Sequence, residues 1–478
     1  MANPLKQLAG ETAIYGFSSI LARVLNFLFV PIYTRTLTQV QYGVVTEFMA
    51  YIAILQVVLV LGLETGCFRF ANKEGEDPRK VYSGALLTVF GLNLAFLAAM
   101  VVFSDPISAA LGYAGYKRLI WYVAGILFSD SLTAILFAKL RQEHKAVKFA
   151  ILKTVKILTE TGANLVLFFV WPAQPDFTYP IFAILVSCVL CLALFIPDLL
   201  RLRPVWDGGV VRRLLAYSLP LMIAALPGVA NDFLDRVLFR YFDTSSEAWR
   251  ATLGVYQAAV KLAVIMNLFI QMFRYAAEPF FFQRAKDKNS KELYAVVMEW
   301  FTAFCGLVLL GVVGYIDVIS LFLGRDFRVG VDVVPVMLLS YMILGMLFNV
   351  SMWYKLSGRT NMAIWITLAG LAVTAVVNVV WMPRYSYWAS AFGHLASYLT
   401  MFILSAWLGS KYYPIPYKWK RIGGIFLLMG AVYAGLWLSF GHVGSLWLRL
   451  GVNTVLIGLY GGAALLLLRH RPVNSTTQ

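Results

Sequence analysis

Long apolar runs follow one another along almost the whole chain, and they limit the folds that this sequence can adopt. Each run is about 20 residues long, the length that an α-helix needs to cross a bilayer. The runs lack strict alternation of apolar and polar residues, which favours helices over a membrane barrel. We therefore predict an all-α polytopic membrane protein with about 14 transmembrane helices. The candidate spans lie near residues 11–34, 43–67, 81–104, 119–139, 147–171, 178–200, 213–239, 252–274, 292–323, 332–354, 361–382, 387–409, 422–440 and 446–468.

The lysine and arginine residues between these spans indicate how the chain crosses the membrane. If the N-terminus lies in the cytoplasm, the inner segments hold 26 basic residues and the outer loops hold 9. Enrichment of basic residues in cytoplasmic loops is the usual pattern in membrane proteins. The first apolar run begins near Ala13 and exceeds 20 residues, so we expect a retained span rather than a cleaved signal peptide. Both termini are then predicted to be cytoplasmic.

Charge and composition also exclude several classes of function. The net charge is +16, but most of the basic residues lie in the loops of a chain that is 60% hydrophobic, so nucleic acid is not an expected partner. The loops are short and contain no GxxxxGK[ST] phosphate-binding motif, so we expect no ATP hydrolysis by this chain. Cys188 and Cys191 form a CxxC inside an apolar run with no histidine nearby, which favours packing residues over a metal site. We expect no metal and no cofactor.

Five basic residues lie within the predicted spans, where a charge costs about 2.5–3.5 kcal/mol on insertion scales. They are Arg23, Lys153, Lys156, Arg236 and Lys261. Lys153, Lys156 and Glu160 are spaced by three and four residues, so they project from one face of a helix. One interpretation is structural: Lys153 could reach the headgroups, and Lys156 with Glu160, or Arg236 with Asp235, could neutralise each other.

A second interpretation takes the five basic residues together. Charged groups at membrane depth face a helix bundle or a water-filled cavity, and here they come from four different spans. A cationic cavity would repel metal ions and cationic drugs, and it would attract phosphate or diphosphate groups. The set therefore predicts an anionic cargo. "KTVKILTE" would form part of the cavity wall and would lower the cost of moving a charged headgroup through the bilayer.

Several stretches of the sequence are similar to a known family of membrane proteins. They are "YGFSSILARVLNFLFVPIYTRTLTQVQYGVVTEF" near the N-terminus, and "YSLPLMIAALPGVANDFLDRVLFRYF" followed by "LGVYQAAVKLAVIMNLFIQMFRYAAEPFFF". With the span count, they resemble the polysaccharide-exporter branch of the multidrug/oligosaccharidyl-lipid/polysaccharide superfamily, the flippases of lipid-linked oligosaccharides. The resemblance implies two six-helix lobes arranged as a V around a central cavity, with two further helices at the C-terminus. We expect lobes at residues 1–204 and 205–412, and the last two spans at 413–478.

The resemblance also implies a function and a set of site residues. The expected cargo is an oligosaccharide repeat unit on undecaprenyl diphosphate, moved by alternating access across the bacterial inner membrane for surface polysaccharide such as O-antigen, capsule or exopolysaccharide. Carried over by position, the cationic cavity would hold Arg23, Lys153, Lys156, Arg236, Lys261 and Arg274. Glu160 and Asp235 would be counter-ions or sites of coupling to H+ or Na+. Membrane lipids and other polysaccharide assembly proteins are the expected partners.

Three other functions remain open from the sequence. A multidrug/cation antiporter of the same superfamily would line its cavity with acids and aromatic residues, whereas basic residues dominate here. A lipid II flippase would carry a denser set of charges in its first two spans than the single Arg23. An integral-membrane polymerase or ligase would place catalytic residues in a sizeable outer loop, and the outer loops here are short; we therefore expect a protein that is not an enzyme.

"YGVV" at residues 42–45 and "LGVY" at residues 253–256 stand at comparable places in the two predicted halves. Each follows the first loop of its half. An internal repeat of this kind is common among transporters, and we treat the pair as a weak indication of one.

Overall fold

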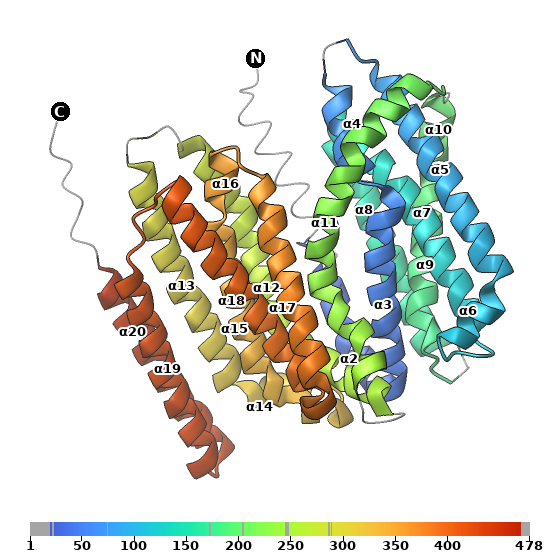
Figure 1. Ribbon diagram of the computed structural model, residues 1–478. Coiled ribbons are helices and arrows are strands. Elements are labelled where there is room, and N and C mark those ends of the chain that lie inside the picture. The colour runs from blue at the N-terminus through green and yellow to red at the C-terminus, as the bar shows by residue number, and fades with distance from the viewer. Residues whose placement is uncertain are drawn as a thin grey trace. The chain divides into compact units, whose positions relative to one another are not determined.

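The computed structural model of the chain describes residues 20–21, 23–73, 75–171, 174–202, 205–243, 248–284, 287 and 289–469. Within these ranges the regular structure is helical and no strand is present (Figure 1). The prediction of an all-α chain is confirmed. Two compact units can be distinguished by their internal contacts, residues 1–254 and residues 255–478.

The first unit holds the helices that carry most of the predicted site residues. Their bounds are α2 Val30–Thr36, α3 Gln39–Val60, α4 Leu63–Ala71, α5 Pro78–Val102, α6 Ser104–Ala110, α7 Lys117–Gln142, α8 Ala146–Leu165, the π-helical turn η1 Val166–Val170, α9 Thr178–Leu194, α10 Ile196–Leu202 and α11 Gly208–Phe242. α7 packs against α3, α5 and α9, and α8 packs against α9. The apolar core between these helices includes Ile135, Phe137 and Phe195.

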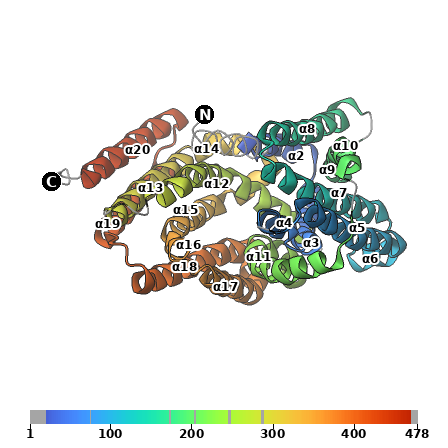
Figure 2. The ribbon, with the colours of Figure 1, turned by 90° about the horizontal axis from the view of Figure 1, so that it is seen from above.

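The second unit begins within α12, Trp249–Arg284, after Gly254. Its other helices are α13 Ser290–Gly314, α14 Ile316–Ile319, η3 Ser320–Phe322, η4 Arg325–Val333, α15 Val334–Val350, α16 Met352–Leu356, α17 Asn361–Tyr385, α18 Tyr387–Tyr412, α19 Trp419–His442 and α20 Leu446–Leu468. α18 packs against α15 and α17, whereas α19 and α20 pack against α13 and against each other. Seen from above, α19 and α20 form one edge of this unit (Figure 2).

Among the described residues, fewer helices qualify as membrane spans than the fourteen that the sequence predicts. Eleven helices of the described residues are long and apolar enough to cross a membrane, or twelve if the bent pair α9 and α10 counts as one span. The predicted span 147–171 is absent from this set because α8 carries Lys148, Lys153, Lys156 and Glu160 within 20 residues. Most of the predicted span 11–34 lies outside the described residues. The count of fourteen is therefore not confirmed.

The two compact units differ from the predicted lobes in where they place α11. α11 packs against α3, α4 and α5, so its contacts place it with residues 1–254 (Figure 1). The sequence placed the same helix in a second lobe that starts at residue 205. Sequence order cannot reveal which helices pack together, and the lobe boundaries stay a prediction.

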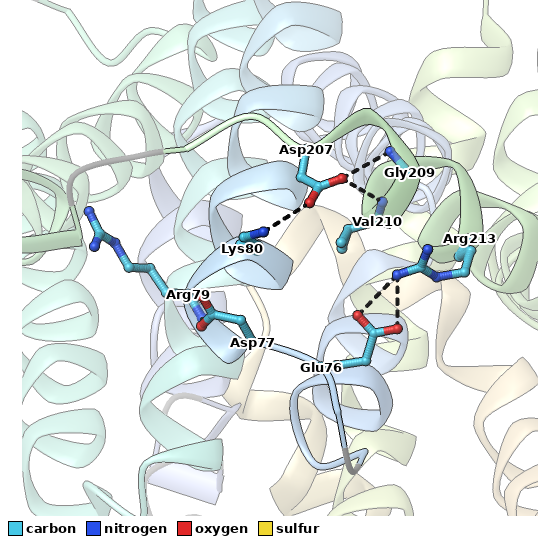
Figure 3. A network of polar contacts seen from close by, with 8 residues as sticks. All are labelled: Glu76, Asp77, Arg79, Lys80, Asp207, Gly209, Val210 and Arg213. Atoms are coloured by element: carbon cyan, nitrogen blue, oxygen red, sulfur yellow. Dashed lines mark hydrogen bonds and ion pairs between the residues drawn. The ribbon is translucent and has the colours of Figure 1, made fainter.

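A polar network joins the first turn of α11 to the segment before α5 (Figure 3). Asp207 caps α11, because its Oδ1 accepts hydrogen bonds from the backbone N–H groups of Gly209 at 3.1 Å and Val210 at 3.2 Å. Its Oδ2 lies 3.2 Å from Nζ of Lys80. These N–H groups, and Lys80 beside them, lower the pKa of the Asp207 carboxyl below its usual value of 3.8. The network thus fixes the start of α11 on the first unit.

We predict that Asp207→Ala lowers the melting temperature of the purified protein by a few degrees, since an alanine cannot cap a helix. Asp207→Asn should retain most of the stability, because asparagine is a good cap and only the ion pair is lost. A carboxyl with a lowered pKa stabilises the fold above its unfolded-state pKa, and this contribution disappears as the pH falls through the lowered value. The difference between wild type and Asp207→Asn should therefore vanish at strongly acid pH. Equal melting temperatures for wild type and Asp207→Ala at pH 7 would contradict the capping role.

The weak internal repeat corresponds to a reciprocal contact between two helices. A Cβ built on Gly43 of α3 would lie 1.9 Å from the carbonyl oxygen of Arg250, and one built on Gly254 of α12 would lie 2.1 Å from that of Gln39. Each glycine thus faces the carbonyl oxygen four residues before the other glycine. Small residues at a crossing allow two helix backbones to approach this closely. The "YG" and "LG" positions of the two halves are therefore contact partners.

Candidate functional site

The polar face of α8 turns toward α7 and α9 inside the first unit. Nζ of Lys156 forms an ion pair and a short hydrogen bond with Oδ1 of Asp130, which lies on α7. The Lys156 side chain is 16% exposed and that of Asp130 is 34% exposed, so the pair is largely withdrawn from the surface of the unit. The counter-ion of Lys156 is thus Asp130 rather than Glu160, which the sequence left open.

Lys153 lies one helical turn before Lys156, with its ammonium group against aromatic rings. Its Nζ is 4.3 Å from the ring centroid of Phe137 and 6.0 Å from that of Phe149. A cation near an aromatic face is stabilised by about 0.5–2 kcal/mol, more when it is desolvated. Lys153, Lys156 and Asp130 therefore bring two positive charges and one negative charge to the same region of α7 and α8.

Glu160 continues this face toward the end of α8. Its backbone oxygen accepts a hydrogen bond of 2.9 Å from Nδ2 of Asn164, and Oδ1 of Asn164 accepts one of 2.9 Å from the hydroxyl of Tyr33 on α2. Within the described part of the chain, the half-buried Glu160 carboxylate has no hydrogen bond or ion pair of its own. Glu160 therefore lies on the same face of α8 as Lys156, about one turn beyond the Lys156–Asp130 pair.

Arg236 and Asp235 lie in the last third of α11. Asp235 is completely buried, and its Oδ1 accepts a hydrogen bond of 2.8 Å from the backbone N–H of Arg236. The guanidinium carbon of Arg236 lies 4.5 Å from the ring centroid of Phe233, and its buried Nε has no hydrogen-bond partner among the described residues. Buried donors without a partner are rare in proteins, and they are often found at functional sites.

The other predicted site residues lie on other helical segments than the Lys156–Asp130 pair. Arg23 lies in a helical stretch of the first unit, and its side chain is exposed. Lys261 is half-buried in α12, and the exposed Arg274 lies near the end of the same helix, with its guanidinium carbon 4.7 Å from the ring centroid of Phe348. The structure brings Lys153 and Lys156 together with Asp130. The shared cavity for all six basic residues stays a prediction.

Two residues near Arg274 were not singled out by the sequence. Arg274, Lys355 and Asn349 line one small groove of the second unit, and Oδ1 of the buried Asn349 has no hydrogen-bond partner among the described residues. Lys355 counts as a cytoplasmic loop charge in the sequence, because it follows the apolar run of α15. Its position next to Arg274 could not be recognised from spacing.

A buried network around Glu47 was also missed. Glu47 of α3 is completely buried, and its carboxylate accepts hydrogen bonds from the hydroxyl groups of Tyr51, at 2.6 Å, and Tyr113. Nε of Arg240, near the end of α11, lies 3.2 Å from Oε1 of Glu47. Nε of Arg250 donates to the Tyr113 hydroxyl at 3.1 Å. The sequence counted Arg240 and Arg250 as charges of outer loops; they hold α3, α11 and the start of α12 together.

A comparison with known families gives one match, which covers the N-terminal half and part of the second half of the chain. A family model described as "Polysaccharide biosynthesis protein" matches residues 8–285. This range includes α8, α11 and α12, and so all six basic residues of the predicted site. No curated protein matches the chain.

Comparison with solved structures concerns the fold. The chain is similar to the lipid II flippase MurJ in an inward closed conformation, with a TM-score of 0.72 and 13% identity over 94% of this chain and 97% of that one. It is also similar to an inward-facing multidrug resistance MATE family transporter of the MOP superfamily, with a TM-score of 0.63 and 12% identity over 82% and 95% of the two chains. A MATE structure in complex with MaD3S gives a TM-score of 0.58 and 14% identity over 86% and 96%. At these identities the likeness establishes a shared fold.

Proposed function

Because the chain belongs to the family of polysaccharide biosynthesis proteins in the MOP superfamily, we propose that it is a flippase for a lipid-linked glycan. The proposed cargo is an oligosaccharide repeat unit on undecaprenyl diphosphate, moved across the bacterial inner membrane for surface polysaccharide. The family description supports a glycan, and the MurJ-like fold supports a mechanism that carries a lipid-linked headgroup. Other polysaccharide assembly proteins are the proposed partners.

The observation that carries this proposal is the Lys156–Asp130 pair with Lys153 beside it. A diphosphate carries about two negative charges, and its transfer into hydrocarbon without compensating groups is prohibitive. Lysine is a usual partner of phosphate oxygens. In the proposed cycle, a diphosphate oxygen replaces the Asp130 carboxylate at Lys156, so the lysine is paired both before and after the exchange.

This exchange gives a physical reason for coupling to an ion. When the diphosphate displaces Asp130, the carboxylate loses its positive partner and becomes an unpaired charge in a region of low dielectric constant. A proton or a sodium ion bound to Asp130 would neutralise it, and the neighbouring Glu160 is a second acceptor. We propose that H+ or Na+ binding here accompanies cargo binding, with Asp235 of α11 as another candidate.

Alternating access requires one end of the transporter to open while the other closes. We propose that the junction of α3, α11 and the start of α12 is a closing contact of this cycle. The Glu47–Arg240 pair and the reciprocal Gly43–Gly254 contact hold this junction together. Both contacts join residues that lie about 200 positions apart in the chain.

We predict that deletion of the gene abolishes one surface glycan and causes its undecaprenyl-diphosphate-linked repeat unit to accumulate. A block in translocation leaves the lipid-linked precursor on the cytoplasmic side, because synthesis continues there. The measurement is mass spectrometry of extracted lipid-linked intermediates, together with analysis of the surface polysaccharide. Complementation with the wild-type gene is the control.

Other outcomes would support the alternative functions. Accumulation of the peptidoglycan precursor lipid II would favour a lipid II flippase. Shorter polysaccharide chains made from repeat units that still reach the outer face would favour a polymerase. Unchanged glycans with increased sensitivity to cationic drugs would favour an antiporter.

A further inference from the structure

A large pocket lies in the second unit, and none of its lining residues belongs to the site described above. Its volume is about 690 Å³, within the range of about 300–1,000 Å³ that is typical of ligand sites. The pocket lies between α19, which packs on α13 and α20, and the starts of α15 and α18, which pack on each other. The pocket is partly open, and its volume is large enough to hold a small-molecule ligand.

The charged groups of the pocket gather in the short helices that connect α13 to α15. Arg328 and Asp332 both come from η4. Arg328 uses Nε and Nη2 to donate to the carbonyl oxygen of Leu323, each at 3.2 Å. A guanidinium group has five N–H donors, so others remain for a ligand. Among the described residues, none forms a hydrogen bond or an ion pair with the exposed Asp332 carboxylate.

The third charged residue of the pocket is already neutralised. Asp317 of α14 lies 2.6 Å from Nη2 of Arg449 on α20. The pocket therefore offers one available cation, Arg328, and one available anion, Asp332, close together in the chain. A ligand that carries one positive and one negative group would complement both.

The opposite wall of the pocket is aromatic and comes from α19, one of the helices that are long and apolar enough to cross a membrane. Tyr433, Trp437 and Phe440 are spaced by four and three residues, so they follow one face of α19. They cover about 10 Å along the helix axis, at a rise of 1.5 Å per residue. Trp388 at the start of α18 stands on the other side of the pocket. A polar end that continues into an aromatic channel fits an amphipathic molecule.

We propose that this pocket binds a single zwitterionic phospholipid with a primary ammonium group, namely phosphatidylethanolamine. Its phosphate binds the free N–H groups of Arg328, its ammonium group donates to Asp332, and an acyl chain lies along Tyr433, Trp437 and Phe440. A choline headgroup has no N–H to donate to Asp332, and an anionic headgroup offers no cation for this carboxylate. The charged groups of the pocket lie at one end, so they fit a headgroup that carries both charges better than they fit a neutral glycan.

The test uses the full-length protein in neutral detergent, stripped of lipid by repeated exchange. Native mass spectrometry follows the binding of phosphatidylethanolamine, and of phosphatidylcholine, phosphatidylglycerol and maltoheptaose in parallel. We expect one phosphatidylethanolamine per chain, bound about tenfold more tightly than the other two lipids, because one charge-assisted hydrogen bond contributes about this factor. The measurement is independent of the proposed cargo, so its failure would leave the flippase proposal standing.

Variants then locate the bound lipid. Asp332→Asn should remove the preference for phosphatidylethanolamine over phosphatidylcholine, and Arg328→Gln should weaken the binding of both about tenfold. Asp326→Asn and Arg325→Gln are matched controls, because they lie on the same helix η4 but outside the pocket. Trp437→Ala should weaken lipid binding without changing the headgroup preference.

Three results would overturn the proposal. The first is equal affinity for the three lipids. The second is an equal loss of lipid affinity in the pocket variants and in their controls. The third is preferential binding of maltoheptaose. The last result would assign the pocket to a carbohydrate.

Discussion

Lys156→Met is expected to reduce export of the glycan at least tenfold, whereas Lys156→Arg should retain most of it. A lysine that pairs with a phosphate contributes about 1.5–3 kcal/mol, and 1.4 kcal/mol of barrier corresponds to about a tenfold change in rate. Arginine keeps the charge, which matters more than the shape of the side chain for a hydrated phosphate. Lys156→Met should also destabilise the protein by about 1–3 kcal/mol, below the value for a fully buried pair, because Asp130 is 34% exposed.

The double variant Asp130→Asn with Lys156→Met separates the two roles of Lys156. Removal of both charges of an ion pair is often neutral for stability, so the double variant should recover a normal melting temperature and normal protein level. Export should stay low if Lys156 binds the diphosphate. Restored export in this variant would show that the pair is only structural and would end the cationic-site interpretation.

A second ion pair on the same helix provides the matched control. Lys148, near the start of α8, lies 2.6 Å from Asp198 of α10. Lys148→Met with Asp198→Asn removes the same kinds of charge, with the lysine again on α8 but at the start of that helix. We expect normal export for this control, measured as surface glycan per cell at equal amounts of membrane-inserted protein.

Gly43→Val is expected to lower the melting temperature of the purified protein by about 5–10 °C. A Cβ at this position would lie 1.9 Å from the carbonyl oxygen of Arg250, so the backbones of α3 and α12 must separate. Overpacking costs about 1–3 kcal/mol, and 1 kcal/mol lowers the melting temperature by about 2–4 °C in a unit of this size. Gly254→Val should act in the same way, because its Cβ would meet the carbonyl oxygen of Gln39 at 2.1 Å.

Gly91→Val is the control for these two variants. Gly91 lies in the interior of α5, and a Cβ built there meets no atom within 4 Å. Its substitution should change the melting temperature by no more than about 2 °C. If Gly43→Val and Gly91→Val melted at the same temperature, the close crossing of α3 and α12 would not contribute to stability.

The site shows how far residue spacing can be used for prediction. Helical periodicity placed Lys153, Lys156 and Glu160 on one face, since this depends only on 3.6 residues per turn. The same periodicity suggested Glu160 as the partner of Lys156, four residues away. The partner in the structure is Asp130, 26 residues earlier on another helix, and no local pattern contains this contact.

The sequence by itself determined the class of the protein. A chain with 60% hydrophobic residues in runs of about 20 must satisfy its backbone hydrogen bonds within helices in a membrane, and the cost of membrane charges singled out the basic residues in its spans. Only the tertiary structure decided how the helices pair. It placed α11 against α3, α4 and α5, it joined Arg240 to Glu47, and it brought Gly43 against Gly254. In a membrane all helices present similar apolar surfaces, so their pairing depends on a few close contacts and polar bonds between residues far apart in the chain.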